Sequence, residues 1–150
     1  VHTVQFPDVP ADAWRNEALE RTWAQVMKVR SVVTGALEVE RREKRIGSSL
    51  ESAPEIYIVD EELLHAVHGI DMAEICITSS AQIIHGAGPD SAWRMDEVRG
   101  VAVVPAKAEG TKCARSWKVL PEVGSDPEYP DVTPRDAEAL REWARLGVSV

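Results

Sequence analysis

A long run of helical periodicity, from Asp12 to about Arg45, is the feature that most constrains the fold of this chain. Its apolar residues recur at steps of three and four along the run: Trp14, Leu19, Trp23, Val26, Val33 and Leu37. Asp12 is a suitable N-cap and Gly47 a suitable stop. A helix this long cannot bury its apolar stripe alone in a small domain. We therefore expect partner helices from outside the chain or a break near Asn16 or Gly35, with part of the apolar face exposed.

Beyond Gly47 the pattern changes to short β-like runs at 55–59, 74–78, 81–85 and 100–106. Between the first two runs, the segment from Asp60 to Gly69 predicts a short helix. The chain is turn-rich from Gly110 onward, and a final helix begins with Thr133 as N-cap and Pro134 at its first position.

The predicted fold class is therefore α+β. It comprises a long N-terminal helix, a small mixed sheet with a short crossover helix, and a turn-rich tail that ends in a helix. The expected units are the end of a helical domain at 1–52, a small α+β domain at 53–110 and the tail at 111–150.

The distribution of charge matters more than its total. A net charge of −8 argues against a protein whose whole surface binds nucleic acid. Between positions 28 and 45, however, six basic residues outnumber three acidic ones: Lys28, Arg30, Arg41, Arg42, Lys44 and Arg45. Cations on the last turns of a helix also complement its dipole, so this group indicates either helix stabilisation or an RNA-backbone contact. Arg41 and Arg45 are spaced to share a helical face, and Glu38 is spaced to pair with Arg42.

Cellular context is indicated by the termini and the cysteines. The chain opens without an initiator methionine or a signal peptide, so we expect a piece of a longer protein. Cys76 and Cys113 do not make a disulfide framework, which fits a reducing cytosol. No apolar run approaches the roughly 18 residues that a membrane helix needs. We therefore expect a cytoplasmic protein outside the membrane.

The tail has the spacing of a zinc site but few zinc ligands. Cys113-Ala-Arg-Ser116 and Thr133-Pro-Arg-Asp136 stand where two C-x₂-C pairs would stand. Neutral hydroxyls are poor zinc ligands, so Cys113 and Asp136 alone would hold the ion badly. Elsewhere the sequence contains no nucleophile elbow, phosphate loop, dinucleotide fingerprint or His-Glu-x-x-His motif.

Four segments carry a resemblance to a known family: RSVVTGALEVERREKRIGSSLESAPEIYI, AEICITSSAQI, GVAVVPAKAEGTKCARSWKVLPEVG and YPDVTPRD. In order, and over essentially the full chain, they resemble the C-terminal region of the bacterial isoleucyl-tRNA synthetases, which are class I aminoacyl-tRNA synthetases. Two motifs are specific, K-x-x-G-S-S-L-E and A-x-G-x-K-C-x-R-x-W. In the usual pattern of that family, the tail carries four zinc-binding cysteines, which match Cys113, Ser116, Thr133 and Asp136 here. The resemblance thus implies a zinc module that has lost its ion.

The resemblance also implies a role. The parent enzyme would use ATP and magnesium to attach isoleucine to its tRNA, and this portion would bind the anticodon stem-loop without any catalytic residue. The implied partners are the tRNA for isoleucine and the remaining synthetase domains, in a monomer. Such a site needs cations for phosphates and planar groups for unstacked bases. The candidates are Arg41, Arg42, Lys44, Arg45, Lys107, Lys112, Arg115, Trp117 and Lys118, with Trp93 and Arg94 as a weaker pair.

Two other functions remain open at this stage. The chain could be a structural module that packs on the synthetase and touches RNA little, which the charge of −8 favours. It could also be an independent metal-dependent enzyme, but this would need a metal or an acid–base pair that the sequence does not show. For the tail, we expect Trp117, with Leu140 and Trp143, to supply an apolar mini-core in place of the ion.

Overall fold

The computed structural model describes Asp8 and residues 14–147. Its longest element, α2 (Glu17–Arg42), begins after Asn16, whose side chain accepts a hydrogen bond from Leu19 N at 3.0 Å. The predicted break near Asn16 is therefore confirmed, whereas Asp12 lies outside the described residues. None of the helices in this part of the chain is both long and apolar enough to cross a membrane.

Helix α2 ends earlier than predicted because a turn, not Gly47, closes it. Lys44 adopts the left-handed conformation at φ 59°. Arg45 N donates to Glu40 O at 2.9 Å and Lys44 N donates to Arg41 O at 3.0 Å. These two bonds form a Schellman motif, in which lysine takes the place that glycine usually holds. The helix therefore stops at Arg42, and Arg45 lies outside it.

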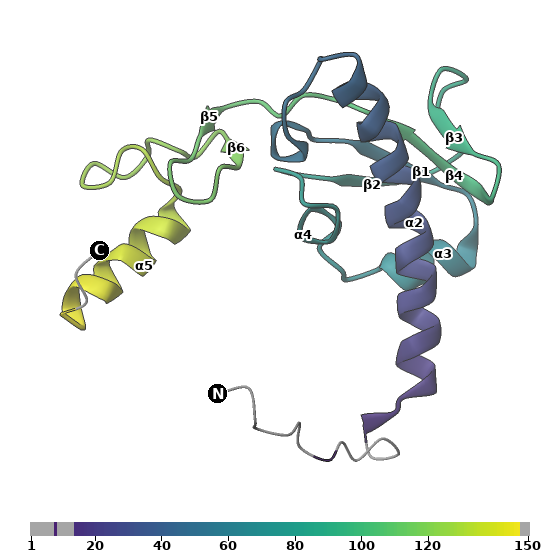
Figure 1. Ribbon diagram of the computed structural model, residues 1–150, viewed down its shortest axis with the longest axis horizontal. Helices are drawn as coiled ribbons and strands as arrows, with labels where there is room; N and C mark the ends of the chain where they lie inside the picture. The colour runs from purple at the N-terminus through teal and green to yellow at the C-terminus, as the bar shows by residue number, and fades with distance from the viewer. Residues whose placement is uncertain (1–7, 9–13, 148–150) are drawn as a thin grey trace.

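The sheet that α2 covers has the strand order β2-β1-β4-β3 (Figure 1). Its strands are β1 (Glu55–Ile58), β2 (Gln82–His85), β3 (Trp93–Met95) and β4 (Val98–Val104). β1 runs parallel to β2 and antiparallel to β4, which in turn pairs antiparallel with β3. The sheet is mixed, as predicted, and three of its strands lie within two residues of the predicted runs. β3 was not predicted, since it is only three residues long.

The predicted strand at 74–78 is wrong, because this segment forms helix α4 (Met72–Cys76). Asp71 caps it by accepting hydrogen bonds from Ala73 N and Glu74 N. Short apolar runs do not distinguish a helix from a strand, and here Met72, Ala73 and Cys76 share one buried face. Together with α3 (Glu61–Val67), which Asp60 caps as predicted, α4 forms the crossover between the parallel strands β1 and β2.

One apolar core lies between α2 and the sheet. Valines of α2 meet the inward-facing residues of β1 and β4, with α3 and α4 closing the sides. Gly35 does not break the helix, because the indole ring of Trp93 packs directly against it. Along the first half of α2, which extends beyond the sheet in Figure 1, apolar side chains are exposed as predicted: Leu19, Trp23 and Met27. Trp14, which precedes the helix, is exposed as well.

The tail forms a second, smaller unit. Its strands β5 (Thr111–Lys112) and β6 (Val119–Leu120) pair antiparallel, and helix α5 (Pro134–Arg145) follows with Thr133 as N-cap, as predicted. Its core consists of Cys113, Val123, Val132 and Ala137, with Leu120, Tyr129 and Leu140 packed against them. The 3₁₀ turn η1 (Ser49–Glu51) lies between α2 and β1.

Candidate functional site

Four of the predicted RNA-binding residues lie at the C-terminal end of α2: Arg41, Arg42, Lys44 and Arg45. Two of them already form ion pairs within the chain. Arg41 forms an ion pair with Glu38 and donates to Ser49 Oγ at 3.0 Å. Arg45 donates to both carboxylate oxygens of Glu40 at 2.6 Å. The predicted common face of Arg41 and Arg45 is wrong, because the helix ends between them. The predicted pairing of Glu38 with Arg42 is also wrong, since Glu38 pairs with Arg41.

Glu40 and Arg45 shift each other's pKa values. The hydrogen bonds from Arg45 hold the pKa of Glu40 below its ordinary value, although burial opposes this effect. The same contact raises the pKa of Arg45. Arg42 and Lys44, by contrast, are exposed and form no ion pair among the described residues. These two cations can therefore meet an external anion without breaking a pair.

Lys107 joins this group although it is far away in sequence. It lines a cavity of about 300 Å³ together with Arg45, Glu40 and Ile46. Backbone hydrogen bonds fix the segment around it, from Ala53 N to Ala106 O and from Ala108 N to Glu51 O, both at 2.8 Å. The chain that leads from the sheet to the tail thus crosses the end of α2, where it adds a further exposed cation (Figure 1).

The tail carries a second group, in which cations stand over indole rings. Lys112 Nζ lies 5.5 Å from the ring centroid of Trp117, and the guanidinium carbon of Arg115 lies 4.8 Å from that of Trp143. Trp117 has a left-handed φ of 64°, and its backbone N–H donates to Cys113 O at 3.0 Å. Its side chain is 62% exposed, so the predicted apolar mini-core around Trp117 is wrong. Leu140 does pack in the core of the tail, as expected.

Lys118 and Ser79 attach the tail to the α+β unit. Lys118 Nζ pairs with Glu74 Oε1 of α4 at 2.5 Å. The buried hydroxyl of Ser79 donates to Leu50 O and accepts from Val119 N at 2.6 Å. Ser79 was not a predicted site residue, because no sequence signal separates a bridging serine from one in a turn.

The four positions that match zinc ligands do converge. Cys113 Sγ donates to Asp136 Oδ2 at 3.2 Å, and Thr133 Oγ1 donates to the same oxygen at 2.9 Å. Ser116 N donates to Cys113 Sγ at 3.4 Å. Ser116 Oγ is buried and meets hydrogen-bond geometry with none of the described groups, although it adds to the lowering of the pKa of Asp136. Within residues 14–147, no three His, Cys, Asp or Glu side chains lie together as a metal-binding group.

Asp136 lies at the centre of this cluster. Burial raises the pKa of its carboxyl, but the hydrogen bonds from Cys113 and Thr133, with the charge of Arg115, outweigh burial and place the pKa below its ordinary value. Arg115 Nε lies 3.6 Å from Asp136 Oδ1. The carboxylate is therefore the form that its surroundings stabilise.

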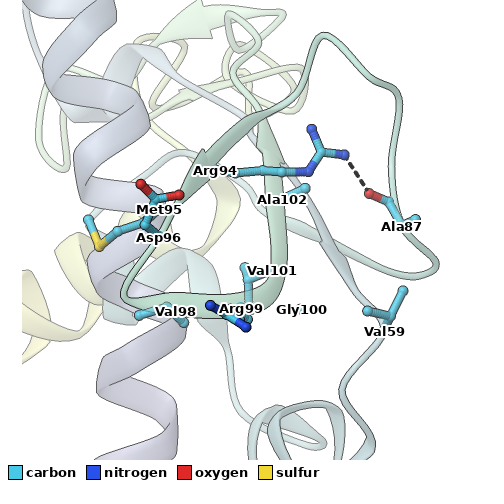
Figure 2. A pocket seen from close by; sticks show the side chains of 10 residues that line it. All are labelled: Val59, Ala87, Arg94, Met95, Asp96, Val98, Arg99, Gly100, Val101 and Ala102. Atoms are coloured by element: carbon cyan, nitrogen blue, oxygen red, sulfur yellow. Dashed lines mark hydrogen bonds between the residues drawn. The ribbon is translucent and has the colours of Figure 1, made fainter.

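The weaker predicted pair, Trp93 and Arg94, lies elsewhere. Figure 2 shows Arg94 reaching across a cavity of about 600 Å³ toward Ala87. Its guanidinium donates to four backbone carbonyls, including Ala87 O and Ala92 O, both at 2.9 Å. Arg94 therefore holds the loop before β3, while Trp93 packs on Gly35 of α2.

Comparison with known proteins gives this geometry a context. No family model matches the chain. The chain is 59% identical over 146 residues to the isoleucine–tRNA ligase of Agrobacterium fabrum, covering 97% of this chain and 15% of that protein. It is 61% identical over 132 residues to that of Caulobacter vibrioides, covering 88% of this chain and 13% of the relative. The chain belongs to the isoleucine–tRNA ligase family.

A third relative aligns with the whole chain. The isoleucine–tRNA ligase of Bradyrhizobium diazoefficiens is 54% identical over 150 residues, which are 100% of this chain and 15% of that protein. The chain thus spans about 15% of the length of these relatives. The basic groups and the Asp136 cluster described above are accordingly features of one ligase segment.

Proposed function

We propose that this chain is the tRNA-binding portion of a cytoplasmic, monomeric isoleucine–tRNA ligase. The whole enzyme would attach isoleucine to its tRNA with ATP and magnesium, and this segment would contact the anticodon stem-loop without taking part in the chemistry. Its partners would be the tRNA for isoleucine and the other domains of the ligase. We propose the same three units as the sequence predicts: the end of the anticodon-binding helical domain at 1–52, a small α+β domain at 53–110 and the zinc-finger-like tail at 111–150.

The observation that carries the proposal is the position of Lys107. The residue belongs to the segment that leads into the tail, yet it lies beside Arg45 at the end of α2. Lys107 thus lies in the stretch of chain between the end of α2, which carries the exposed Arg42 and Lys44, and the tail, which carries the exposed Lys112. Phosphate groups on one strand of RNA would find cations along this path, although the net charge of the chain is −8.

The exposed indole of Trp117 supports the same function. A bulky residue in the left-handed region is costly and persists only where its surroundings impose it. Here the backbone bonds of Cys113 hold Trp117 outward, beside the cation of Lys112. A planar group next to a cation suits an unstacked base and its phosphate.

Charge reversal tests the proposal. Glutamate at Arg42, Lys44 and Lys107 should lower the affinity for an isoleucine tRNA transcript. It should also reduce the slope of log affinity against log salt by roughly 0.7–0.9 for each phosphate that the variant no longer neutralises. Arg21→Glu, on the far half of the same helix, is the matched control. An affinity loss no larger than that of the control would contradict RNA binding at this surface.

A second function is favoured by the exposed apolar side chains of α2. Leu19, Trp23 and Met27 form an uncovered stripe, which suits packing against other parts of the ligase. Under this alternative, polar substitution of the stripe would weaken the docking of the segment in the intact enzyme. Charge reversal at Arg42, Lys44 and Lys107 would then leave tRNA affinity unchanged.

A further inference from the structure

The centre of the tail has the shape of a metal site but does not have its chemistry. Cys113, Ser116, Thr133 and Asp136 meet there, but only the thiol and the carboxyl of this set can bind zinc as anions. Asp136 Oδ2 already accepts hydrogen bonds from two protein donors. These residues do not fit the zinc that the resemblance implies.

We propose that the tail folds without a metal, around the carboxylate of Asp136, which stands where four cysteines at these positions would hold an ion. This inference concerns the folding of the tail and does not depend on RNA binding.

The bonds of Asp136 supply the linkage that an ion would otherwise supply. Thr133 and Asp136 occupy the N-cap and third positions of α5, and each bonds the other, since Asp136 N also donates to Thr133 Oγ1 at 3.2 Å. This is an N-cap in which the Asp136 carboxylate accepts from the capping hydroxyl, and it would explain an aspartate here by itself. It does not explain the bond from Cys113, which comes from a loop 23 residues away and ties that loop to the helix.

Charge and burial favour an anion at this point. The side chain of Asp136 is 16% exposed, and the guanidinium of Arg115 lies beside it. The N-terminal end of α5 adds the positive pole of the helix dipole. A carboxylate with two donors, a cation and a helix end is well compensated for the loss of water.

The loop at Cys113 is also held by its own backbone. Cys113 N donates to Lys118 O at 2.8 Å, and Ala114 N donates to Asp131 O at 2.9 Å. Cys113 is fully buried in an apolar cluster with Val123 and Ala137. The turn thus keeps its shape through hydrogen bonds and packing, with the Asp136 carboxylate as the polar link.

Metal content is the first test. The full 150-residue chain is purified without chelator, its zinc is measured by elemental analysis, and its thermal melt is recorded with and without EDTA. We expect far less than one zinc per chain and the same melting temperature in both samples. About one zinc per chain, with a melt that EDTA lowers, would overturn the proposal.

Substitution of Asp136 supplies the second test. Asp136→Asn preserves the shape but removes the charge, and it should lower the melting temperature by several degrees, equally with and without EDTA. The matched control is Glu138→Gln, an exposed carboxyl on the same helix, which should leave the melt unchanged. A melting temperature of Asp136→Asn equal to that of the wild type would contradict the claim that the tail folds around the Asp136 carboxylate.

A gain of metal binding tests the position of the carboxylate. The triple variant S116C/T133C/D136C would place four thiols at the converging positions, and we expect it to bind about one zinc per chain and to become sensitive to EDTA. The triple alanine variant at the same positions is the control and should bind none. A folded cysteine variant that binds no zinc would show that Asp136 does not stand at the place of an ion.

Discussion

Replacing Gly35 by alanine should destabilise the chain, against the usual preference of helices. Gly35 lies in the interior of α2, where alanine is ordinarily better than glycine by about 1 kcal/mol. A Cβ at this position, however, would overlap Cη2 of Trp93 and would lie 3.0 Å from Cζ2 and Cζ3. The ring has little room to move, because β3 pairs with β4 and Trp93 packs against the core.

The expected magnitude follows from the difference between these two effects. Overpacking of a core costs roughly 1–3 kcal/mol, and the gain in helix propensity offsets about 1 kcal/mol of it. The net effect of Gly35→Ala should be a loss of about 1 kcal/mol in the free energy of unfolding, measured by urea denaturation with a fixed m-value.

The double variant isolates the cause. In a Trp93→Leu background the contact is absent, so Gly35→Ala should now stabilise the chain by up to about 1 kcal/mol. The coupling between the two positions should be on the order of 1–3 kcal/mol. If Gly35→Ala stabilises the wild-type chain, or behaves the same in both backgrounds, the close packing of Trp93 on α2 is refuted.

Three further predictions concern the hydrogen bonds of Ser79, the ion pair of Asp126 with Arg141 and the buried thiol of Cys76. Ser79→Ala leaves two partly buried backbone groups, Leu50 O and Val119 N, without this partner and should cost about 1 kcal/mol in urea denaturation, while the exposed Ser80→Ala should not. Hydrogen bonds from Arg141 hold the pKa of Asp126 below its ordinary value, although burial opposes them. Its contribution to stability is therefore present above about pH 4–5 and is lost as the pH falls below about 3.9 toward the folded-state pKa, and Asp126→Asn should flatten that loss. Burial raises the pKa of Cys76 to about 11, so iodoacetamide at pH 8 should modify it only in urea, and rapid labelling of the native chain would contradict this environment.

The elements that sequence predicts well are those with local signals. Asp60 and Thr133 each cap the helix that follows them, as predicted, because a side-chain oxygen needs only the next turn of backbone as its partner. The periodicity of α2 and the β-branched runs of β1 and β4 are likewise carried by neighbouring residues. These features required no knowledge of tertiary contacts.

The errors have both local and distant causes. The segment 74–78 reads as a strand by composition, but Asp71 caps it as a helix and the core buries one of its faces. Lys44 closes α2 in a conformation that lysine rarely adopts, three residues before the glycine that looked like the stop. Gly35 was predicted as a possible break, but the helix continues through it, and the ring of Trp93 packs beside it from a strand too short to predict.

Some features of the candidate site are indicated by the sequence and others are not. Cys113, Ser116, Thr133 and Asp136, the four positions that the resemblance matches to zinc ligands, lie together in the structure, although Cys113 and Asp136 are 23 residues apart. The pairing of Arg45 with Glu40 and the outward position of Trp117 do not follow from spacing. They depend on where a turn places one side chain relative to its neighbours.

The bond network at Ser79 has a consequence for recognition. Its hydroxyl joins η1, the loop after α4 and strand β6, so the tail cannot rotate against the sheet without breaking the bond from Val119 N and the ion pair between Lys118 and Glu74. The distance between the cations at the end of α2 and those of the tail is therefore set before any partner arrives. A ligand that reaches both groups would find a preorganised surface, and little of its binding free energy would be spent on ordering the protein.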